Sequence, residues 1–129
     1  MLYAGVAEAQ TVVTVTIEGV RADEGTIRVA LFDNRKDFLK KAAYTAARDV
    51  TSETVLVSFS AVTPGKYGIS AFHDRDGNGE LSTNGLGIPT EGFGFGNDAM
   101  GIFGPPSFDR ASVEVQGDTM VVRLRLRHF

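Results

Sequence analysis

Cysteine is absent from the 129 residues, and histidine occurs only twice, at His73 and His128. Without cysteine the chain forms no disulfide, performs no thiolate catalysis and builds no cysteine-based zinc or iron–sulfur site. With two histidines, a multi-histidine metal centre within one chain is not expected. No stretch is long and apolar enough to span a membrane, so we expect no transmembrane segment. Chemistry, if present, must come from carboxylate, amide, hydroxyl, imidazole and aromatic groups.

Positive charge is also scarce, with a net charge of −3 and a sequence pI near 5.3. Binding to nucleic acid or to an anionic membrane usually requires a basic face, so neither partner is expected. The one basic feature is the alternating stripe of Arg123, Arg125 and Arg127. Such alternation is typical of the solvent-facing side of a strand.

The first ten residues, MLYAGVAEAQ, end in Ala7-Glu8-Ala9, a small-x-small pattern that precedes signal-peptidase cleavage, here before Gln10. The basic and fully apolar parts of a signal are missing from them. Two interpretations therefore stay open: the remnant of a signal peptide that starts upstream, or a plain N-terminal tail. In either case, residues 11–129 are predicted to form a single domain, which is long enough for a substantial core.

Alternation of apolar and polar residues dominates this domain and predicts strands with one apolar face. The alternating segments are 13–18, 27–32, 55–60, 67–72, 111–116 and 120–127. Turn residues separate them, including Thr63-Pro64-Gly65-Lys66 and a two-residue hairpin signal at Gly117-Asp118. The pattern predicts an all-β protein, a single antiparallel β-sandwich of prealbumin or immunoglobulin type with about seven strands.

Residues 34–48 interrupt the alternation. Apolar residues there recur at helical spacing, so we predict a short helix near 35–47. The residues concerned are Phe38, Leu39, Ala42, Ala43 and Ala46. One or two further short strands are expected near 48–51 or in the glycine-rich region that follows residue 85.

The most informative stretch runs from Asp74 to Asn97, DRDGNGELSTNGLGIPTEGFGFGN. Its first half follows the spacing of a calcium-binding loop, in which alternate side chains of a tight turn converge on one cation and a glycine permits the sharp bend. Positions 1, 3, 5, 6, 7 and 9 of that loop would be Asp74, Asp76, Asn78, Gly79, Glu80 and Ser82. Glu80 would contribute its backbone carbonyl.

The second half of the loop departs from this pattern. Position 12 is Gly85 in place of a bidentate glutamate, so Glu91 or Asp98 would have to close the site. Without such a carboxylate we expect weak binding of Ca²⁺ or another hard cation, with a Kd on the order of 10⁻⁴ to 10⁻³ M. The predicted ligands are Asp74, Asp76, Asn78, Glu80, Ser82 and Glu91. The alternative is a metal-free turn in which Asp and Asn side chains accept bonds from nearby backbone amides.

Phenylalanines alternate with glycines in residues 85–104, here called the Gly/Phe-rich segment. Phe93, Phe95 and Phe103, with His73 and Asn97, would form a surface for a small molecule, glycan or partner protein. The alternative is that the rings fill the core. A hydrolase acting on a cell-envelope substrate would need His73 and Glu91 as an acid–base pair. No nucleophile-elbow motif is present, and we assign no catalytic residue.

The run from Thr63 to Leu81, TPGKYGISAFHDRDGNGEL, with Gly87 to Asn97, GIPTEGFGFGN, resembles a bacterial family of uncharacterised extracytoplasmic proteins, the domain of unknown function 2141 family. The resemblance extends over residues 12–126. It singles out His73, Asp74, Asp76, Asn78, Gly79, Pro89, Glu91, Gly92, Phe95 and Asn97. The chain departs at Ser82, where the family commonly has aspartate, and at Gly96, where serine is common.

The resemblance implies secretion or a periplasmic location and names no reaction. The Pro64-Gly65-Lys66-Tyr67 segment is also similar to transthyretin-like and carboxypeptidase-regulatory-like sandwiches, which bears on the fold alone. We therefore expect an extracytoplasmic, non-enzymatic module in which a calcium-type loop orders the Gly/Phe-rich segment for a ligand or envelope protein. The oligomeric state is left open.

Overall fold

The computed structural model describes residues 9–21, 24–82, 89, 91–102 and 104–129. No α-helix occurs among these residues, and the all-β prediction is confirmed. The elements are β1 (Thr11–Glu18), β2 (Thr26–Phe32), β3 (Tyr44–Asp49), β4 (Val55–Val62), β5 (Gly65–Asp74), β6 (Phe93–Phe95), the 3₁₀ turn η1 (Gly96–Asp98), β7 (Ser112–Val115) and β8 (Thr119–Arg125). Within the described ranges, nothing resembles an apolar helix of membrane-spanning length.

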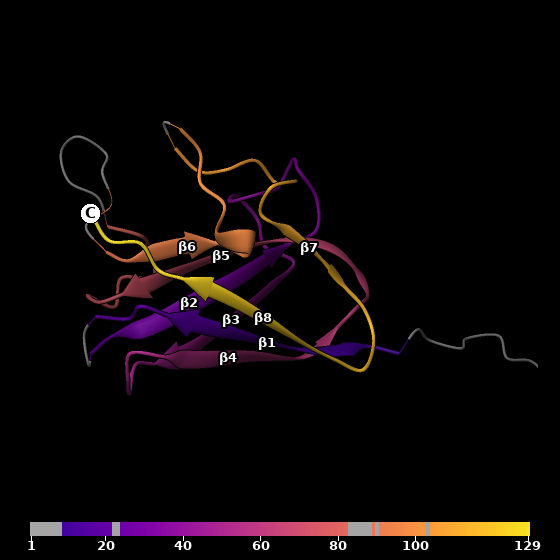
Figure 1. Ribbon diagram of the computed structural model, residues 1–129, viewed down its shortest axis with the longest axis horizontal. Helices are drawn as coiled ribbons and strands as arrows, with labels where there is room; N and C mark the ends of the chain where they lie inside the picture. Colours follow the sequence, from indigo (N-terminus) through magenta and orange to yellow (C-terminus); the bar gives the residue numbers. More distant parts are fainter. Residues whose placement is uncertain (1–8, 22–23, 83–88, 90, 103) are drawn as a thin grey trace, which may run out of the picture.

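The strands form two packed sheets, which confirms the predicted β-sandwich (Figure 1). One sheet has the order β4-β1-β8, and the other has the order β3-β2-β5-β6, with β7 also paired to β5. Most strand pairs are antiparallel, whereas β1 and β8 run parallel. The first and last strands of the domain are therefore neighbours in one sheet.

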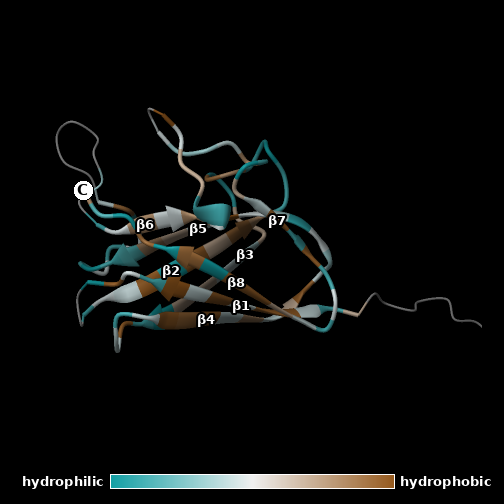
Figure 2. Ribbon diagram, in the orientation of Figure 1, coloured by the Kyte–Doolittle hydropathy of each residue, from teal (hydrophilic) through white to brown (hydrophobic). Residues whose placement is uncertain are grey.

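The core lies between the sheets and is built by the alternation seen in the sequence. Val13, Val15 and Ile17 of β1 are fully buried, as are Ile27 and Leu31 of β2. In Figure 2 the apolar residues concentrate on the strands of both layers and the polar residues on the connections. The hydrophobic effect therefore accounts for the strand positions that the sequence predicts.

The hairpin predicted at Gly117-Asp118 is wrong, because the two strands that this turn connects lie in different sheets. The turn links β7 in one sheet to β8 in the other. Gly117 has the expected left-handed φ of 83°. However, Thr11 Oγ1 donates to the Gly117 carbonyl at 2.6 Å and the Val12 amide donates to the Asp118 carbonyl at 2.9 Å. These bonds hold the turn against β1, so the chain changes sheet there.

The short helix predicted near 35–47 is also wrong. The described chain makes turns from residue 35 to residue 40 and enters β3 at Tyr44. Asn34 Oδ1 accepts the Asp37 amide at 2.9 Å, and Leu39 takes a left-handed φ of 62°, which interrupts helical geometry. β6 is the additional short strand expected in the glycine-rich region, whereas β3 starts within the predicted helix and overlaps the strand expected near 48–51 only at residues 48 and 49.

A second apolar cluster covers the outer face of the β3-β2-β5-β6 sheet. It contains Phe93, Phe95 and Ala111, with Phe38, Phe72, Leu81 and Met100 packed against them. Phe93 lies opposite Phe72 in the β5–β6 ladder. The Phe93 amide also donates to the Arg127 carbonyl at 3.0 Å, and the Arg127 amide donates back at 2.7 Å. This pair of bonds joins the two sheets along one side.

Candidate functional site

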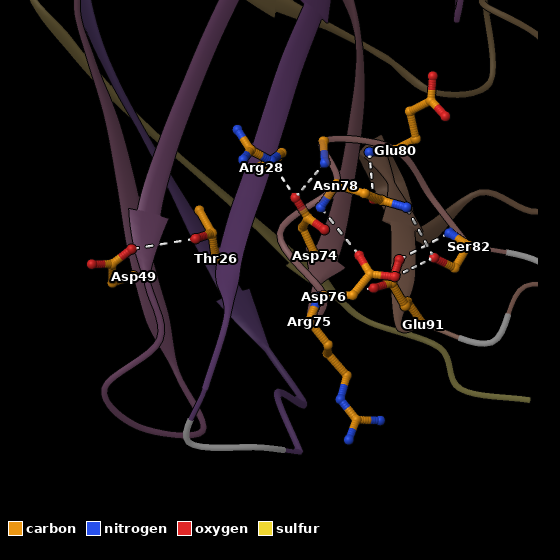
Figure 3. A network of polar contacts seen from close by, with 11 residues as sticks. Thr26, Arg28, Asp49, Asp74, Arg75, Asp76, Asn78, Glu80, Ser82 and Glu91 are labelled. Carbon is orange, nitrogen blue, oxygen red and sulfur yellow. Dashed lines mark hydrogen bonds and ion pairs between the residues drawn. The ribbon is translucent and has the colours of Figure 1, made fainter.

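The acidic loop begins at Asp74, the last residue of β5. Alternation along β5 turns His73 toward the core and Asp74 to the opposite face, where the Asp74 side chain is nevertheless fully buried. Its Oδ2 accepts a bond from Arg28 Nε at 2.7 Å and one from the Gly79 amide at 2.8 Å (Figure 3). One oxygen of Asp74 is therefore satisfied by a guanidinium and by a backbone N–H.

The turn after Asp74 caps itself in part. Asp76 Oδ1 accepts the Asn78 amide at 3.2 Å, and Asn78 Oδ1 accepts the Glu80 amide at 2.9 Å. Gly77 and Gly79 have left-handed φ values of 72° and 79°, which glycine adopts without strain. These contacts are the ones that the metal-free interpretation of the loop requires.

Glu91, which follows the acidic loop in sequence and lies just before β6, holds both ends of the loop. Its side chain is buried, with 5% of the residue exposed. Oε2 accepts the Arg75 amide at 2.8 Å and Oε1 accepts the Ser82 amide at 2.9 Å. Ser82 Oγ in turn donates to Asp76 Oδ2 at 2.8 Å. Glu91 therefore connects both ends of the acidic turn to the start of β6.

Three carboxylates meet at this point. One oxygen each of Asp74, Asp76 and Glu91 lies within 4.8 Å of the others. Asp74 Oδ1 is buried and has no hydrogen-bond partner among the described residues. An unsatisfied buried acceptor costs about 1–3 kcal/mol. Backbone amides thus satisfy several oxygens of the cluster, and one buried oxygen of Asp74 is left without a hydrogen-bond donor among the described residues.

Asp74 carries a charge at neutral pH. Burial alone would raise the pKa of its carboxyl group, but the bonds from Arg28 and from the Gly79 amide outweigh burial and hold the pKa below its usual value. Arg28 supplies one positive charge to a cluster of three acids. The site therefore has a net negative charge and oxygen ligands, which suit a hard cation.

The remaining predicted ligands contribute unequally. Asn78 Nδ2 approaches Ser82 Oγ at 3.5 Å, which keeps both side chains beside Asp76. The Glu80 carboxylate is exposed and points away from the three acids in Figure 3. Asp98 lies elsewhere, since its Oδ1 accepts the Arg125 amide at 2.9 Å. Of the two candidate closing residues, Glu91 is the one in the cluster.

Three members of the predicted ligand or partner surface, His73, Phe93 and Phe95, are buried in the structure. His73 is 1% exposed, Phe93 6% and Phe95 8%. His73 Nε2–H donates to the Glu24 carbonyl at 2.6 Å, so its ring fixes the connection between β1 and β2. The phenylalanines fill the outer apolar cluster, as hydrophobic burial favours.

Asn97 is exposed, but its amide is occupied. Nδ2 donates to the carbonyls of Arg110 and Ser112 at 3.0 and 2.8 Å, and the residue takes a left-handed φ of 61°. It fastens η1 to the segment before β7. Phe103, the last member of the predicted surface, lies outside the described residues.

Arg28 is the functional candidate that the sequence did not reveal. It precedes Asp74 by 46 residues and sits in an ordinary alternating strand. Only the register of β2 against β5, with Arg28 opposite Phe72, brings its guanidinium to Asp74. A polar residue at an alternating outward position carries no signal of its own.

A protein-family model matches most of the chain. The family described as "Uncharacterized protein conserved in bacteria (DUF2141)" matches residues 15–123. A search of curated proteins and a search of solved structures found no significant match.

Proposed function

The chain belongs to this bacterial DUF2141 family, and on that premise we propose that it is an extracytoplasmic, non-enzymatic β-sandwich module whose acidic loop binds calcium weakly. The observation that carries the proposal is the buried Asp74 Oδ1, which has no hydrogen-bond partner within the described part of the chain. One oxygen of the same carboxylate lies within 4.8 Å of an oxygen of Asp76 and of an oxygen of Glu91. A cation between them would give this oxygen a ligand and reduce the repulsion among the three acids.

The expected affinity follows from the number of ligands. Calcium takes six to eight oxygens at about 2.3–2.6 Å. Asp74, Asp76 and Glu91 supply carboxylate oxygens, and water would complete the coordination. Several oxygens of these acids already accept backbone amides, which limits what remains for the metal. We therefore expect a Kd on the order of 10⁻⁴ to 10⁻³ M, the range of extracellular modules.

The proposed role of the cation is to order the Gly/Phe-rich segment. One residue, Gly92, separates Glu91 from β6, and the Gly92 carbonyl accepts the His73 amide at 2.8 Å. A cation held jointly by Asp74 and Glu91 would fix the end of β5 to the start of β6. The surface formed around this junction would then be presented to a ligand or an envelope protein.

The location outside the cytoplasm is supported by the start of the fold. β1 begins at Thr11, directly after the predicted cleavage point before Gln10. Cleavage there would leave β1 complete. Weak calcium sites also suit compartments in which the ion is abundant. Fractionation of bacteria that express the native gene would test this, and recovery with the cytoplasm would contradict it.

The calcium proposal predicts a thermal shift. Protein stripped with a chelator and then given about 10 mM calcium should gain roughly 1.4 kcal/mol if the Kd is about 1 mM. For a domain of this size, that gain raises Tm by roughly 5 °C. Differential scanning calorimetry measures the change directly. A Tm that does not move at this calcium concentration would overturn the proposal.

Two variants localise the effect. Asp76→Asn removes one exposed charge from the cluster and keeps an oxygen acceptor, so the calcium shift should largely disappear. Glu80→Gln removes one charge from the same loop, but its carboxylate points away from the cluster, so the shift should remain. Equal loss in both variants would show general charge attraction in place of a defined site.

The hydrolase alternative gains no support from the geometry. His73 and Glu91 are buried, and their side chains bond to backbone groups of the connections around them. An acid–base pair needs access to substrate. The alternative of a small-molecule or glycan site on the Gly/Phe-rich segment needs exposed aromatic rings, and Phe93 and Phe95 are buried.

A further inference from the structure

A second polar site lies at the end of β8, where the molecule is locally positive. A cavity of about 390 Å³ there is lined by Arg21, Asp98, Arg125, Leu126, Arg127, His128 and Phe129. We call this region the arginine corner. An adjoining cavity of about 320 Å³ shares Arg21, Arg125, Leu126 and His128 with it and is also lined by the acidic residues Glu18 and Glu53. The acidic loop and the proposed calcium site play no part in either cavity.

The frame of the corner is fixed by backbone contacts. Alternation along β8 buries Leu124 and Leu126 in the core, so Arg125 and Arg127 project outward. The backbone of Arg127 is held by its pair of bonds to Phe93. The backbone that carries Arg125 and Arg127 is therefore held by hydrogen bonds, while their guanidinium groups are exposed to solvent.

His128 anchors the other wall. Its Nε2–H donates to the Gly19 carbonyl at 2.7 Å. Its ring lies so close to Gly92 that a Cβ there would stand 2.6 Å from Cε1. A side chain at position 92 would therefore collide with the ring unless His128 moved.

The charge of the corner opposes that of the whole chain. Three arginines and one aspartate give a formal +2, counting His128 as neutral, whereas the chain carries −3. Asp98 uses Oδ1 to accept the Arg125 amide. Among the described residues, the guanidinium groups of Arg21, Arg125 and Arg127 form no ion pair.

We propose that the arginine corner binds a phosphate monoester with an apolar or aromatic body. Guanidinium groups bind phosphate oxygens in a bidentate manner, and a dianion matches the formal +2. The cavity volume falls within the usual range of small-molecule sites, roughly 300–1,000 Å³. Phe129, which is 75% exposed, provides a ring face for the organic part.

Phenyl phosphate is the probe for this site. Titration into ¹⁵N-labelled protein in the presence of EDTA, which removes calcium, should shift the amide resonances of residues 125–129 and of Arg21. Inorganic phosphate should bind more weakly because it lacks the aromatic body, and phenol should not bind. If the amide resonances do not shift at about 10 mM phenyl phosphate, the Kd is too weak for a specific ligand site and the proposal is overturned.

A matched pair of variants tests the assignment. Arg127→Gln removes a guanidinium that lines the cavity and should weaken binding by about tenfold, the usual effect of losing a charge-assisted bond. Arg123→Gln removes the neighbouring member of the same stripe, which is exposed outside the cavity, and should change affinity by less than about twofold. Equal weakening in both variants would overturn the site. An unchanged Tm would show that each variant is folded.

A lipid headgroup could supply the same phosphate chemistry. Cosedimentation with phosphatidylcholine vesicles that carry phosphatidic acid, in EDTA, distinguishes this source. Vesicle binding that Arg127→Gln weakens would support the site and identify a headgroup as its ligand. Binding of phenyl phosphate without vesicle binding would support the site and identify a soluble ester.

Discussion

The glycines of the Gly/Phe-rich segment show how single residues position both proposed sites. In β6, Phe93 and Phe95 face the outer apolar cluster, and Gly94 faces the opposite way. A Cβ on Gly94 would stand 2.9 Å from the Arg125 carbonyl oxygen, and one on Gly96 would stand 2.2 Å from that of Ala111. Alternation of phenylalanine and glycine therefore produces a strand with one bulky face and one bare face.

Gly96→Ala should destabilise the protein by roughly 1–3 kcal/mol, since the new methyl group would collide with backbone that cannot easily move. Gly104→Ala is the matched control, because its Cβ would meet nothing within 4 Å. Urea denaturation gives both values. A stability of Gly96→Ala within about 0.5 kcal/mol of wild type would contradict the packing described here.

At the scale of elements, the strand from Gly65 to Asp74 is held at its start by a tyrosine pair. Tyr67 Oη donates to the Thr63 carbonyl at 2.6 Å, and its ring packs edge-on against Tyr44 of β3 at 5.8 Å. The pair ties β3 and β5 to the connection after β4. Burial raises the pKa of Tyr67 to about 12.

This shift predicts an alkaline transition. A raised pKa in the folded state stabilises the protein fully below the unfolded value of 10.0, and the contribution is lost as pH rises from 10.0 to about 12. Tm should therefore fall through this window, and Tyr67→Phe should flatten the fall. Tyr44→Phe should flatten the fall less, because burial is the largest cause of the raised Tyr67 pKa and Tyr44 adds a smaller part. Equal curves for wild type and Tyr67→Phe would contradict the assignment.

The elements themselves were largely predictable, because six alternating segments became strands with buried and exposed faces. The connections were less so. Residues near Phe38 have helical spacing, yet their rings and turns serve the outer cluster, and Ala46 pairs with Val29 in a ladder. Gly117-Asp118 has hairpin chemistry, but bonds to β1 decide the path of the chain. Tertiary contacts overrode local preference in both cases.

The same distinction holds for the candidate sites. Spacing alone brought Asp74 and Asp76 together and indicated that a later acid would close the loop. Arg28 was invisible, because its role depends on the pairing of strands far apart in sequence. Alternation predicts a solvent-facing arginine stripe, but the cavity beside it forms only where the end of β8 lies next to Arg21 and Asp98, which are far from it in sequence.

At the scale of the whole molecule, the sheets differ in which strands are interior. β1 lies between β4 and β8, and β2 and β5 are flanked on both sides, whereas β3 and β4 are at edges. Strands paired on both sides open only with the whole domain, and edge strands open locally.

Hydrogen exchange should follow this order. Amides of β1, β2 and β5 that bond within the sheets should exchange more slowly than those of β3 by about tenfold or more. Two-dimensional NMR after transfer to D₂O measures the rates. Amides of β3 that remain as protected as those of β1 would contradict the edge assignment.

The parallel pairing of β1 and β8 sets an order in time. Val12 is aligned with Thr119, so one sheet lacks a strand until nearly the whole domain has been synthesised. A nascent chain would hold β1 and β4 as an open two-stranded ribbon, which is marginally stable in water. Completion of the fold therefore waits for the last strand to leave the ribosome.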